Sequence, residues 1–263
     1  MADATAVWAY CVADRMAPEW FSHLAGVGEY PVSVVTGGPL AAAVSVVGLA
    51  EYGEQALARH LEDLTWLEST ARSHHAVVEA VGAHVPVIPM RLATLYRDRD
   101  SLGAMLEARQ QDFAEALGRV TARTEWGVKV YAVRPEPAAT AAGEDHDADR
   151  PGAAYLRRRR SQLDASQHAQ RAALAGAEEI HASLGQLAVA AGTRAPQAPQ
   201  LSGQSDPMIL NAVYLVEDGE SAAFAEAVQR VASLHEPVRV ELTGPWPPYS
   251  FAFVAEAAPA ARQ

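Results

Sequence analysis

The chain alternates between short apolar runs of strand character and longer segments with a helical repeat of apolar residues, and it does so in both halves. In the first half, runs at 7–12, 31–35 and 40–47 are strand-like, and a helical segment at about 54–84 follows them. Short connections between such elements favour helices packed in a layer on a sheet. We therefore expect an α+β protein with two helix-on-sheet domains, long amphipathic helices and a split β-α-β strand order of the ferredoxin kind.

Two segments of the first half have the repeat of amphipathic helices. From about 54 to 84, apolar residues recur at steps of three and four, and charged residues occupy the remaining face. The segment 101–120 has the same pattern. Each is therefore predicted to be one continuous helix with one buried stripe. The predicted stripes are Leu57, Leu61, Leu64, Leu67, Ala71, His74, Val78 and Val81 in the first helix, and Leu102, Met105, Leu106, Phe113 and Leu117 in the second.

Glycine and proline mark the turns and edges of the first sheet. The sequence Thr36-Gly37-Gly38-Pro39 joins two apolar runs, and it predicts a β-hairpin because paired glycines adopt positive φ at little cost. A phosphate-binding loop is the alternative, but no Lys-Ser or Lys-Thr follows the second glycine. The segment 85–92 is strand-like and carries two prolines, so we expect an edge strand or a strand entered through a bend. A short helix at 18–25 and a strand at 125–133 complete this half.

The composition changes at 134–150, which is rich in Pro, Ala, Gly and acidic residues and lacks periodic apolar positions. We therefore expect an N-terminal domain at 1–136, a linker at 137–150 and a C-terminal domain at 151–263. The expected elements of the C-terminal domain are a helix at 151–191, a loop at 192–206, strands at 209–216, 238–243 and 250–254, and a helix at 221–235.

Charge and cysteine content exclude several classes of protein. The formal net charge of −11 works against binding to nucleic acid or to anionic membranes. The cationic run Arg157–Arg160 fans around a predicted helix, which favours a solvated surface over a local site for an acidic partner. Cys11 is the single cysteine and lies in an apolar run, which is typical of a buried, inert thiol in a reducing compartment. Without a signal peptide or an apolar span of roughly 18 residues, the expected location is cytosolic.

The sequence contains no recognisable catalytic or metal-binding pattern. Neither His60 nor His74 has a second ligand at the spacing of a known metal motif, so we interpret both as core or boundary residues. The carboxylate pairs Glu62-Asp63 and Glu178-Glu179 are neighbours in helices and diverge, so they cannot flank one substrate atom. No glycine-flanked nucleophile elbow is present. We therefore expect no catalytic residues, no cofactor and no metal, and a protein that acts by binding another protein.

Four residues are the candidates for contact with that partner. Arg91 lies in an apolar strand-like segment, where it occupies either an outward-facing position or a structural ion pair. The segment 242–251 has three prolines that remove backbone donors, so we do not expect it to pair in a sheet. A rigid knuckle there would hold Trp246 and Tyr249, either as a lid on the core of the C-terminal domain or as binding anchors. Phe251, at the end of this segment, is the fourth candidate.

In combination these motifs resemble the gas vesicle GvpL/GvpF family. The matching stretches are 60–68 with 71–74, then Val87-Ile88-Pro89-Met90-Arg91, then 125–130, and finally 242–251, in the order of the family. The chain departs from the family pattern after the arginine, where Leu92-Ala93 stands in place of Phe-Gly. Because alanine disfavours positive φ, Ala93 predicts that the backbone there has an ordinary conformation.

The resemblance implies a minor gas vesicle component or assembly factor located at the gas vesicle or in the cytoplasm. Such a protein would bind the hydrophobic main shell protein, and possibly other accessory proteins of the vesicle, and limit aggregation during vesicle nucleation. It also implies two α+β domains, of which the N-terminal one is ferredoxin-like. Two alternatives stay open: a ferredoxin-like protein that binds a small ligand or catalyses a reaction, and a purely structural constituent of the shell.

Overall fold

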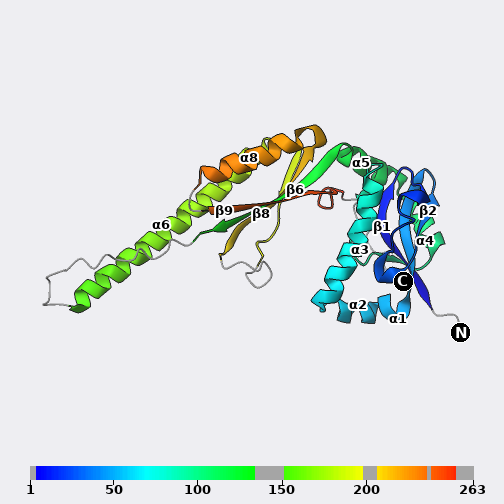
Figure 1. Ribbon diagram of the computed structural model, residues 1–263, viewed down its shortest axis with the longest axis horizontal. Helices are drawn as coiled ribbons and strands as arrows, with labels where there is room; N and C mark the ends of the chain where they lie inside the picture. The colour runs from blue at the N-terminus through cyan, green and yellow to red at the C-terminus, as the bar shows by residue number, and fades with distance from the viewer. Residues whose placement is uncertain (1–3, 134–150, 198–205, 236–237, 253–263) are drawn as a thin grey trace, which may run out of the picture. The chain divides into compact units, whose positions relative to one another are not determined.

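The computed structural model describes residues 4–133, 151–197, 206–235 and 238–252, with side chains from residue 159 onward in the second of these ranges. The chain forms two compact units, one of residues 1–125 together with 246–263 and the other of residues 126–245 (Figure 1). Below, they are called unit 1 and unit 2.

These units divide the chain along lines that differ from the expected domains 1–136 and 151–263. The first boundary falls inside a strand, after Glu125, and the end of the chain belongs to unit 1. The expected linker 137–150 lies outside the described residues, so its role stays a prediction.

Unit 1 contains a five-stranded sheet, and β1 runs antiparallel to β3, β4 and β5, as β2 does to β3. The order is β2-β3-β1-β4, and β5 also pairs with β1. The central strand β1 is therefore flanked on both sides, and β2 and β4 form the edges. The strands are β1 (Thr5–Ala13), β2 (Val32–Gly37), β3 (Leu40–Gly48), β4 (Ile88–Pro89) and β5 (Leu95–Tyr96).

The predicted hairpin and edge strand are confirmed. Strands β2 and β3 pair up to Gly37 and Leu40, and Gly38 in the turn has a φ of 58°. Strand β4 has two residues and pairs with Val12 and Cys11 of β1, so the prolines of this segment leave only a short edge.

The expected helix at 18–25 is wrong in extent, since only a 3₁₀ turn, η1 (Pro18–Trp20), forms there, and a second turn, η2 (Val27–Glu29), follows.

The predicted helix at 54–84 is interrupted. It forms as α2 (Glu54–His60) and α3 (Leu64–Gly82), preceded by a short α1 (Leu49–Tyr52). The interruption has a local cause, because the Asp63 carboxylate accepts hydrogen bonds from the backbone N–H groups of Thr65 and Trp66, at 2.9 and 3.3 Å, and caps a new helix. The break turns Leu61 and Leu64 outward, with 44% and 73% of their surface exposed.

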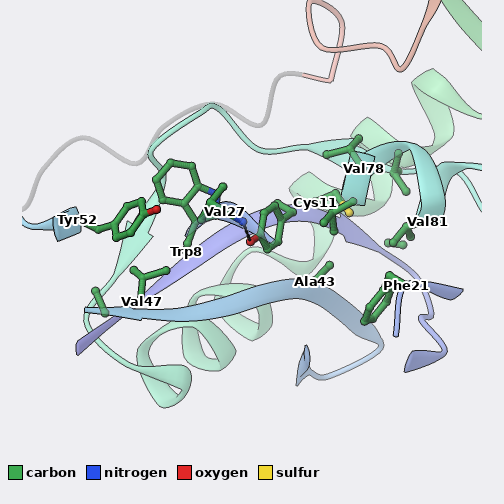
Figure 2. Close-up of a cluster of buried hydrophobic side chains, with 14 of the residues drawn as sticks. Trp8, Cys11, Phe21, Val27, Ala43, Val47, Tyr52, Val78 and Val81 are labelled. Carbon is green, nitrogen blue, oxygen red and sulfur yellow. Dashed lines mark hydrogen bonds between the residues drawn. The ribbon is translucent and has the colours of Figure 1, made fainter. Parts of the chain in front are cut away.

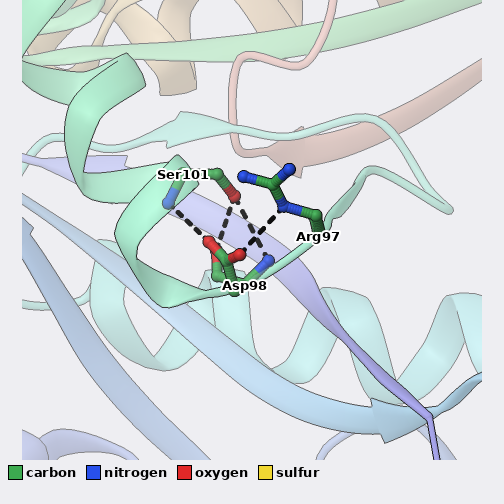
Figure 3. A network of polar contacts seen from close by, with 3 residues as sticks. All are labelled: Arg97, Asp98 and Ser101. Atoms are coloured by element: carbon green, nitrogen blue, oxygen red, sulfur yellow. Dashed lines mark hydrogen bonds and ion pairs between the residues drawn. The ribbon is translucent and has the colours of Figure 1, made fainter.

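The predicted helix at 101–120 is also two helices, α4 (Arg99–Ala108) and α5 (Gln110–Val120), which meet at Arg109. Asp98 begins α4: its carboxylate accepts from the Ser101 N–H at 2.7 Å, and the Ser101 hydroxyl accepts from the Asp98 N–H at 3.2 Å (Figure 3). The Ser101 backbone bond, together with Arg97, holds the pKa of Asp98 below its usual value. Leu102, Leu106, Phe113 and Leu117 are buried, as the stripe predicts.

Two cores lie on the two faces of the unit 1 sheet. Trp8 and Tyr10 of β1 pack with Val78 and Val81 of α3 on one face, part of which is shown in Figure 2. On the other face, Val7, Ala9 and Val12 pack with residues of α4 and α5. Burial on both faces explains why the 7–12 run is continuously apolar. The expected burial of Cys11 is confirmed, and burial raises the pKa of its thiol to about 12.

Unit 2 contains a second sheet of order β7-β8-β6-β9, with helices packed on one face. Its core joins β6 and β8 to α6 and α8 through residues such as Val130, Tyr214, Ile180, Leu184 and Phe224. The element order β-α-β-β-α-β fits the expected split arrangement, while the ferredoxin-like description of the N-terminal domain stays a prediction. The elements are β6 (Arg123–Ala132), α6 (Pro151–Gly185), β7 (Ala190–Thr193), β8 (Met208–Glu217), a 3₁₀ turn η3 (Asp218–Glu220), α8 (Ser221–Ser233) and β9 (Val238–Trp246).

Three expected boundaries in this half are wrong. The helix at 151–191 ends at Gly185, and the loop at 192–206 begins with the last residues of β7. The strand at 250–254 does not form over its described residues, which belong to a turn, and the remainder lies outside the described residues.

A buried histidine joins the first core to the segment that follows α3. The Trp8 indole N–H donates to Nδ1 of His74 at 3.0 Å, so the proton of the neutral ring sits on Nε2, which donates to the Met90 carbonyl oxygen at 3.1 Å. The ring is only 3% exposed. Burial lowers the His74 pKa from 6.5 to about 4, against the opposing effect of the Met90 bond.

We expect unit 1 to lose stability as the pH falls from 7 to 5. The unfolded chain takes up the His74 proton below its ordinary pKa of 6.5, whereas the folded chain takes it up only near 4. At 1.36 kcal/mol per pKa unit this favours the unfolded state by about 2 kcal/mol at pH 5. Urea unfolding of wild type and His74→Gln at both pH values measures the difference, and the variant should lack this part of the slope. A His74 ring that titrates near 6.5 by NMR would contradict the expectation.

Candidate functional site

The end of the described chain forms a turn on unit 1, called here the C-terminal knuckle (residues 246–252). Strand β9 leads into it and includes Gly244 and Trp246, so the expectation that 242–251 cannot pair in a sheet is wrong for its first residues. Gly244 has a φ of 121°, which only glycine adopts readily. After it, the backbone N–H groups of Phe251 and Ala252 donate to the Pro248 carbonyl oxygen at 3.1 and 3.0 Å, which closes the turn.

Charged side chains from unit 1 hold the C-terminal knuckle in place. The Glu125 carboxylate, only 5% exposed, accepts from the Ser250 N–H at 2.6 Å and from the Ser250 hydroxyl. The Arg119 guanidinium donates to the Phe251 carbonyl oxygen at 3.2 Å. Bonds to ionised groups are among the stronger ones in proteins, so the knuckle has a fixed position on unit 1.

The aromatic residues of the C-terminal knuckle contact α3. The Trp246 ring lies 5.4 Å from the His75 ring, edge to face, and the Tyr249 hydroxyl lies 3.2 Å from Nδ1 of His75. Burial raises the pKa of Tyr249 above its usual value. Because Tyr249 packs on the core of unit 1, the prediction of a lid on the C-terminal domain is wrong. Trp246 keeps 44% of its surface exposed.

Arg91 follows β4 and begins a tight turn. Its carbonyl oxygen accepts from the Thr94 N–H at 3.1 Å and from the Thr94 hydroxyl at 2.7 Å. Ala93 within this turn has a φ of 63°, so the expectation of an ordinary conformation there is wrong. The turn requires the left-handed region, and this chain meets the requirement with an alanine. The Arg91 side chain is exposed.

Two pockets flank α5 and the segment 85–92. One, called here the arginine pocket because Arg91 and Arg109 line it, has a volume of about 180 Å³. The other, called here the proline groove because Pro39 and Pro86 line it, has a volume of about 320 Å³. Both are lined by residues of 85–92 and of α5. The arginine pocket is lined by Ile88, Pro89, Met90, Arg91, Thr94, Tyr96, Met105, Arg109, Phe113, Tyr249 and Ala252, and the proline groove by Asp14, Pro39, Leu40, Pro86, Gln110, Ala114, Leu117 and Thr121.

The structure brings two of the four candidate residues together, because Arg91 and Tyr249 line the same pocket. Trp246 and Phe251 are not among the residues that line it; Trp246 contacts His75, and the Phe251 backbone is held by Arg119. The sequence analysis did not single out Arg109, which lies within the segment predicted to be one continuous helix. In the structure Arg109 stands at the junction of α4 and α5 and lines this pocket.

Within the described ranges, no group of three or more His, Cys, Asp and Glu side chains is placed so that it could hold a metal ion. Of the helices in that part of the chain, none is both long enough and apolar enough to cross a membrane.

Comparison with known proteins identifies relatives over almost the whole chain. Residues 6–253 match the family described as gas vesicle synthesis protein GvpL/GvpF. Gas vesicle protein L of Streptomyces sp. (strain CB03234) is 39% identical over 236 residues, which cover 88% of this chain and 86% of that protein. Gas vesicle protein F of the same organism is 25% identical over 264 residues, covering 93% and 98%.

Solved structures show the same fold. The crystal structure of GvpF from Anabaena sp. PCC7120 superposes with a TM-score of 0.65 at 18% identity, covering 96% of this chain and all of that one (100%). GvpF from Microcystis aeruginosa gives a TM-score of 0.60 at 15% identity, covering 94% and 99%. The mixed helix and sheet arrangement with two sheets is therefore shared with these proteins.

Ala93→Gly should stabilise unit 1. An L-residue in the left-handed region is disfavoured by roughly 1–2 kcal/mol, and glycine removes this cost. Glycine also makes the unfolded chain more flexible, which offsets part of the effect, so we expect the free energy of unfolding to rise by about 0.5–1 kcal/mol. Urea unfolding measures it. The matched control is Ala104→Gly in α4, which should lose about 1 kcal/mol because its helical backbone favours alanine. Equal losses in both variants would contradict the expectation.

Glu125→Ala should loosen the C-terminal knuckle. It removes both bonds to Ser250 and leaves that N–H without its charged acceptor, so we expect a loss of about 2–4 kcal/mol in the free energy of unfolding. Ser250→Ala removes only the hydroxyl bond and should cost less, about 1–2 kcal/mol. Urea unfolding followed by tryptophan fluorescence compares the two, and a Ser250→Ala loss as large as that of Glu125→Ala would refute this account.

Proposed function

Because the chain belongs to the GvpL/GvpF family and so takes part in gas vesicle formation, we propose that it binds the hydrophobic main shell protein and limits its aggregation during vesicle nucleation. The observation that carries the proposal is the pair of pockets beside 85–92 on unit 1, whose linings include large apolar side chains such as Leu40, Leu117 and Phe113. Apolar depressions of this kind fit side chains that a shell subunit would otherwise expose to other copies of itself. The protein then acts at the gas vesicle, with the shell protein as its main partner.

The edges of the unit 1 sheet argue for side-chain docking there in preference to strand addition. Along β2, the Arg99 guanidinium donates to the Ser33 hydroxyl at 2.9 Å and to the Val34 carbonyl oxygen, so this edge is partly covered. At the opposite edge, β4 has only two residues, and Pro89 lacks a backbone donor. Strand addition needs a longer row of unpaired backbone groups.

Unit 2 offers a longer edge. Strand β9 has nine residues and stands at the end of the strand order in the described sheet. Val238, Val240 and Leu242 pack toward the helices, while Glu241 bonds to the Tyr131 hydroxyl at 3.3 Å on the other face. The exposed edge of β9 is therefore the place on unit 2 where a strand of the shell protein would pair.

The pocket volumes give little support to the alternative of an enzyme or small-ligand protein. Sites for small molecules have volumes of about 300–1,000 Å³, and the arginine pocket, at about 180 Å³, lies well below that range. The proline groove, at about 320 Å³, only reaches its lower limit, and its described lining has a single acidic residue, Asp14. The family itself consists of gas vesicle proteins.

The proposal is tested by co-expression with the main shell protein, followed by pull-down and light scattering. We expect a complex and a slower rise in scattering. Ala114 is exposed and lines the proline groove, so Ala114→Glu should weaken both effects without unfolding the protein. The matched control is Ala104→Glu, at an exposed position of α4 outside both pockets, which should behave as wild type. If no complex forms and scattering rises at the usual rate, the proposal fails.

A structural constituent of the shell remains attached to purified vesicles, whereas a transient assembly factor does not. Quantitative mass spectrometry of washed vesicles separates the two, because a retained constituent persists at a constant ratio to the shell protein. Loss of the protein on washing favours a transient role.

A further inference from the structure

The arginine pocket combines an apolar floor with a cationic rim. Ile88 of β4 and Phe113 of α5 are each 2% exposed, and Ala252 of the C-terminal knuckle is 6% exposed, so buried apolar residues from three separate elements form the floor. Met90 and Met105 extend this apolar surface. Methionine adapts its shape to a neighbour, which suits a pocket that receives a side chain from another molecule.

Two guanidinium groups supply the charge. Arg109 donates from Nε to the Asp112 carboxylate at 3.0 Å, and its Cζ lies 6.0 Å from the centre of the Phe113 ring. Its side chain lines the pocket and is 19% exposed, so it is accessible from solvent. Arg91 lines the same pocket from the turn after β4. Among the described residues that line it, these two are cationic and none is acidic, although the chain as a whole has a net charge of −11.

Hydrogen bonds hold the backbone around the pocket in place. Tyr249 and Ala252 belong to the C-terminal knuckle, which Glu125 and Arg119 fasten to unit 1. Met90 is fixed on the other side, because its carbonyl oxygen accepts from His74 and its N–H donates to the Tyr10 carbonyl oxygen at 2.8 Å. Because its backbone is already ordered, the pocket loses little backbone entropy when it is filled.

Size and charge together select the occupant. A volume of about 180 Å³ holds one large side chain and is small for a drug-sized ligand. An apolar floor fits leucine, isoleucine or phenylalanine, and the guanidinium groups at the rim fit a carboxylate in bidentate geometry. We propose that the arginine pocket binds a partner protein through a large apolar side chain with an acidic residue next to it. The proposal rests on the proposed function and names the chemistry of the partner segment that this site would receive.

The test uses the full chain with its methionine methyl groups labelled with ¹³C, and the probe acetyl-Leu-Asp-amide. We expect the methyl resonances of Met90 and Met105 to shift with saturable binding, while Met16 and Met208, which do not line the pocket, stay in place. The isosteric acetyl-Leu-Asn-amide should bind about tenfold more weakly, because charge-assisted bonds are lost. Acetyl-Ala-Asp-amide should also bind more weakly, since it leaves the apolar floor uncovered.

Substitutions test whether Arg91 supplies the charge that binds the carboxylate of the probe. Arg91→Gln should reduce the affinity for acetyl-Leu-Asp-amide to that for the Asn peptide. Arg97→Gln is the control, because Arg97 is exposed, pairs with Asp98 and does not line the pocket, and it should leave the affinity unchanged (Figure 3). Arg91 is the better site for the substitution, since Arg109 stands at the junction of two helices and bonds to Asp112.

Several outcomes would overturn the proposal. These are unshifted Met90 and Met105 resonances, equal affinity for the Asp and Asn peptides, or wild-type affinity in Arg91→Gln. A chain truncated after Ala252 whose Met90 and Met105 resonances move without any probe would show that its own C-terminal segment fills the pocket, which also overturns it.

The light-scattering assay with the shell protein distinguishes failure of the pocket proposal from failure of the proposed function. If the peptides fail to bind while wild type and Arg91→Gln both still suppress shell-protein aggregation, the pocket proposal is wrong and the proposed function stands. If the Asp peptide binds as expected while aggregation is unaffected, the pocket proposal is supported and the proposed function is wrong.

Discussion

The ring of His74 lies between the central strand of unit 1 and the segment that carries the arginine pocket, and both of its nitrogens are bonded. The Trp8 indole donates to one, and the other donates to the Met90 carbonyl oxygen. A neutral imidazole is the only form that can serve both partners, which agrees with the pKa of about 4 that burial imposes. This chain of bonds runs from β1 through α3 to the pocket wall, so the position of Met90 depends on the packing of the core.

The candidate site depends equally on the end of the chain. Without the C-terminal knuckle, the arginine pocket would lack Tyr249 and Ala252, and Ile88 and Phe113 would face an open surface. The bonds from Glu125 and Arg119 fix residues that are more than a hundred positions distant in sequence. Glu125 is only 5% exposed, and a buried carboxylate is tolerated because Ser250 supplies two donors to it.

At two places the backbone departs from the conformation that the local sequence favours, and in both a side chain of the pocket lies next to the departure. The turn after Arg91 keeps a left-handed backbone although Ala93 disfavours it, because the Thr94 bonds and the adjoining strand impose the geometry. The junction at Arg109 interrupts a sequence with a continuous helical repeat and directs the guanidinium toward Phe113. In each case the outcome is a defined shape for the pocket, at a modest cost in helix or turn stability.

The sequence alone determined the classes of element and most of their positions. The apolar run at 7–12, the paired glycines at 37–38 and the prolines of 85–92 each restrict the backbone locally, so the central strand, the hairpin and the short edge strand were predictable. It also pointed to Arg91 and Tyr249 as unusual residues. The family resemblance, drawn from motifs spread along the chain, agrees with the match over residues 6–253.

Only the tertiary structure decided where the helices end and which distant segments meet, because the hydrophobic repeat contains neither. The helix repeat continues through Asp63 and Arg109, although the helices end there. At Asp63 a capping carboxylate begins a new helix and leaves the hydrophobic pattern unchanged, and at Arg109 the break occurs without a side-chain cap. The return of the C-terminal knuckle to unit 1 is likewise invisible in the sequence, because the contacts that hold it join residues far apart along the chain. The pocket exists only where these distant segments meet, and for that reason the sequence could name two of its residues but not the cavity they share.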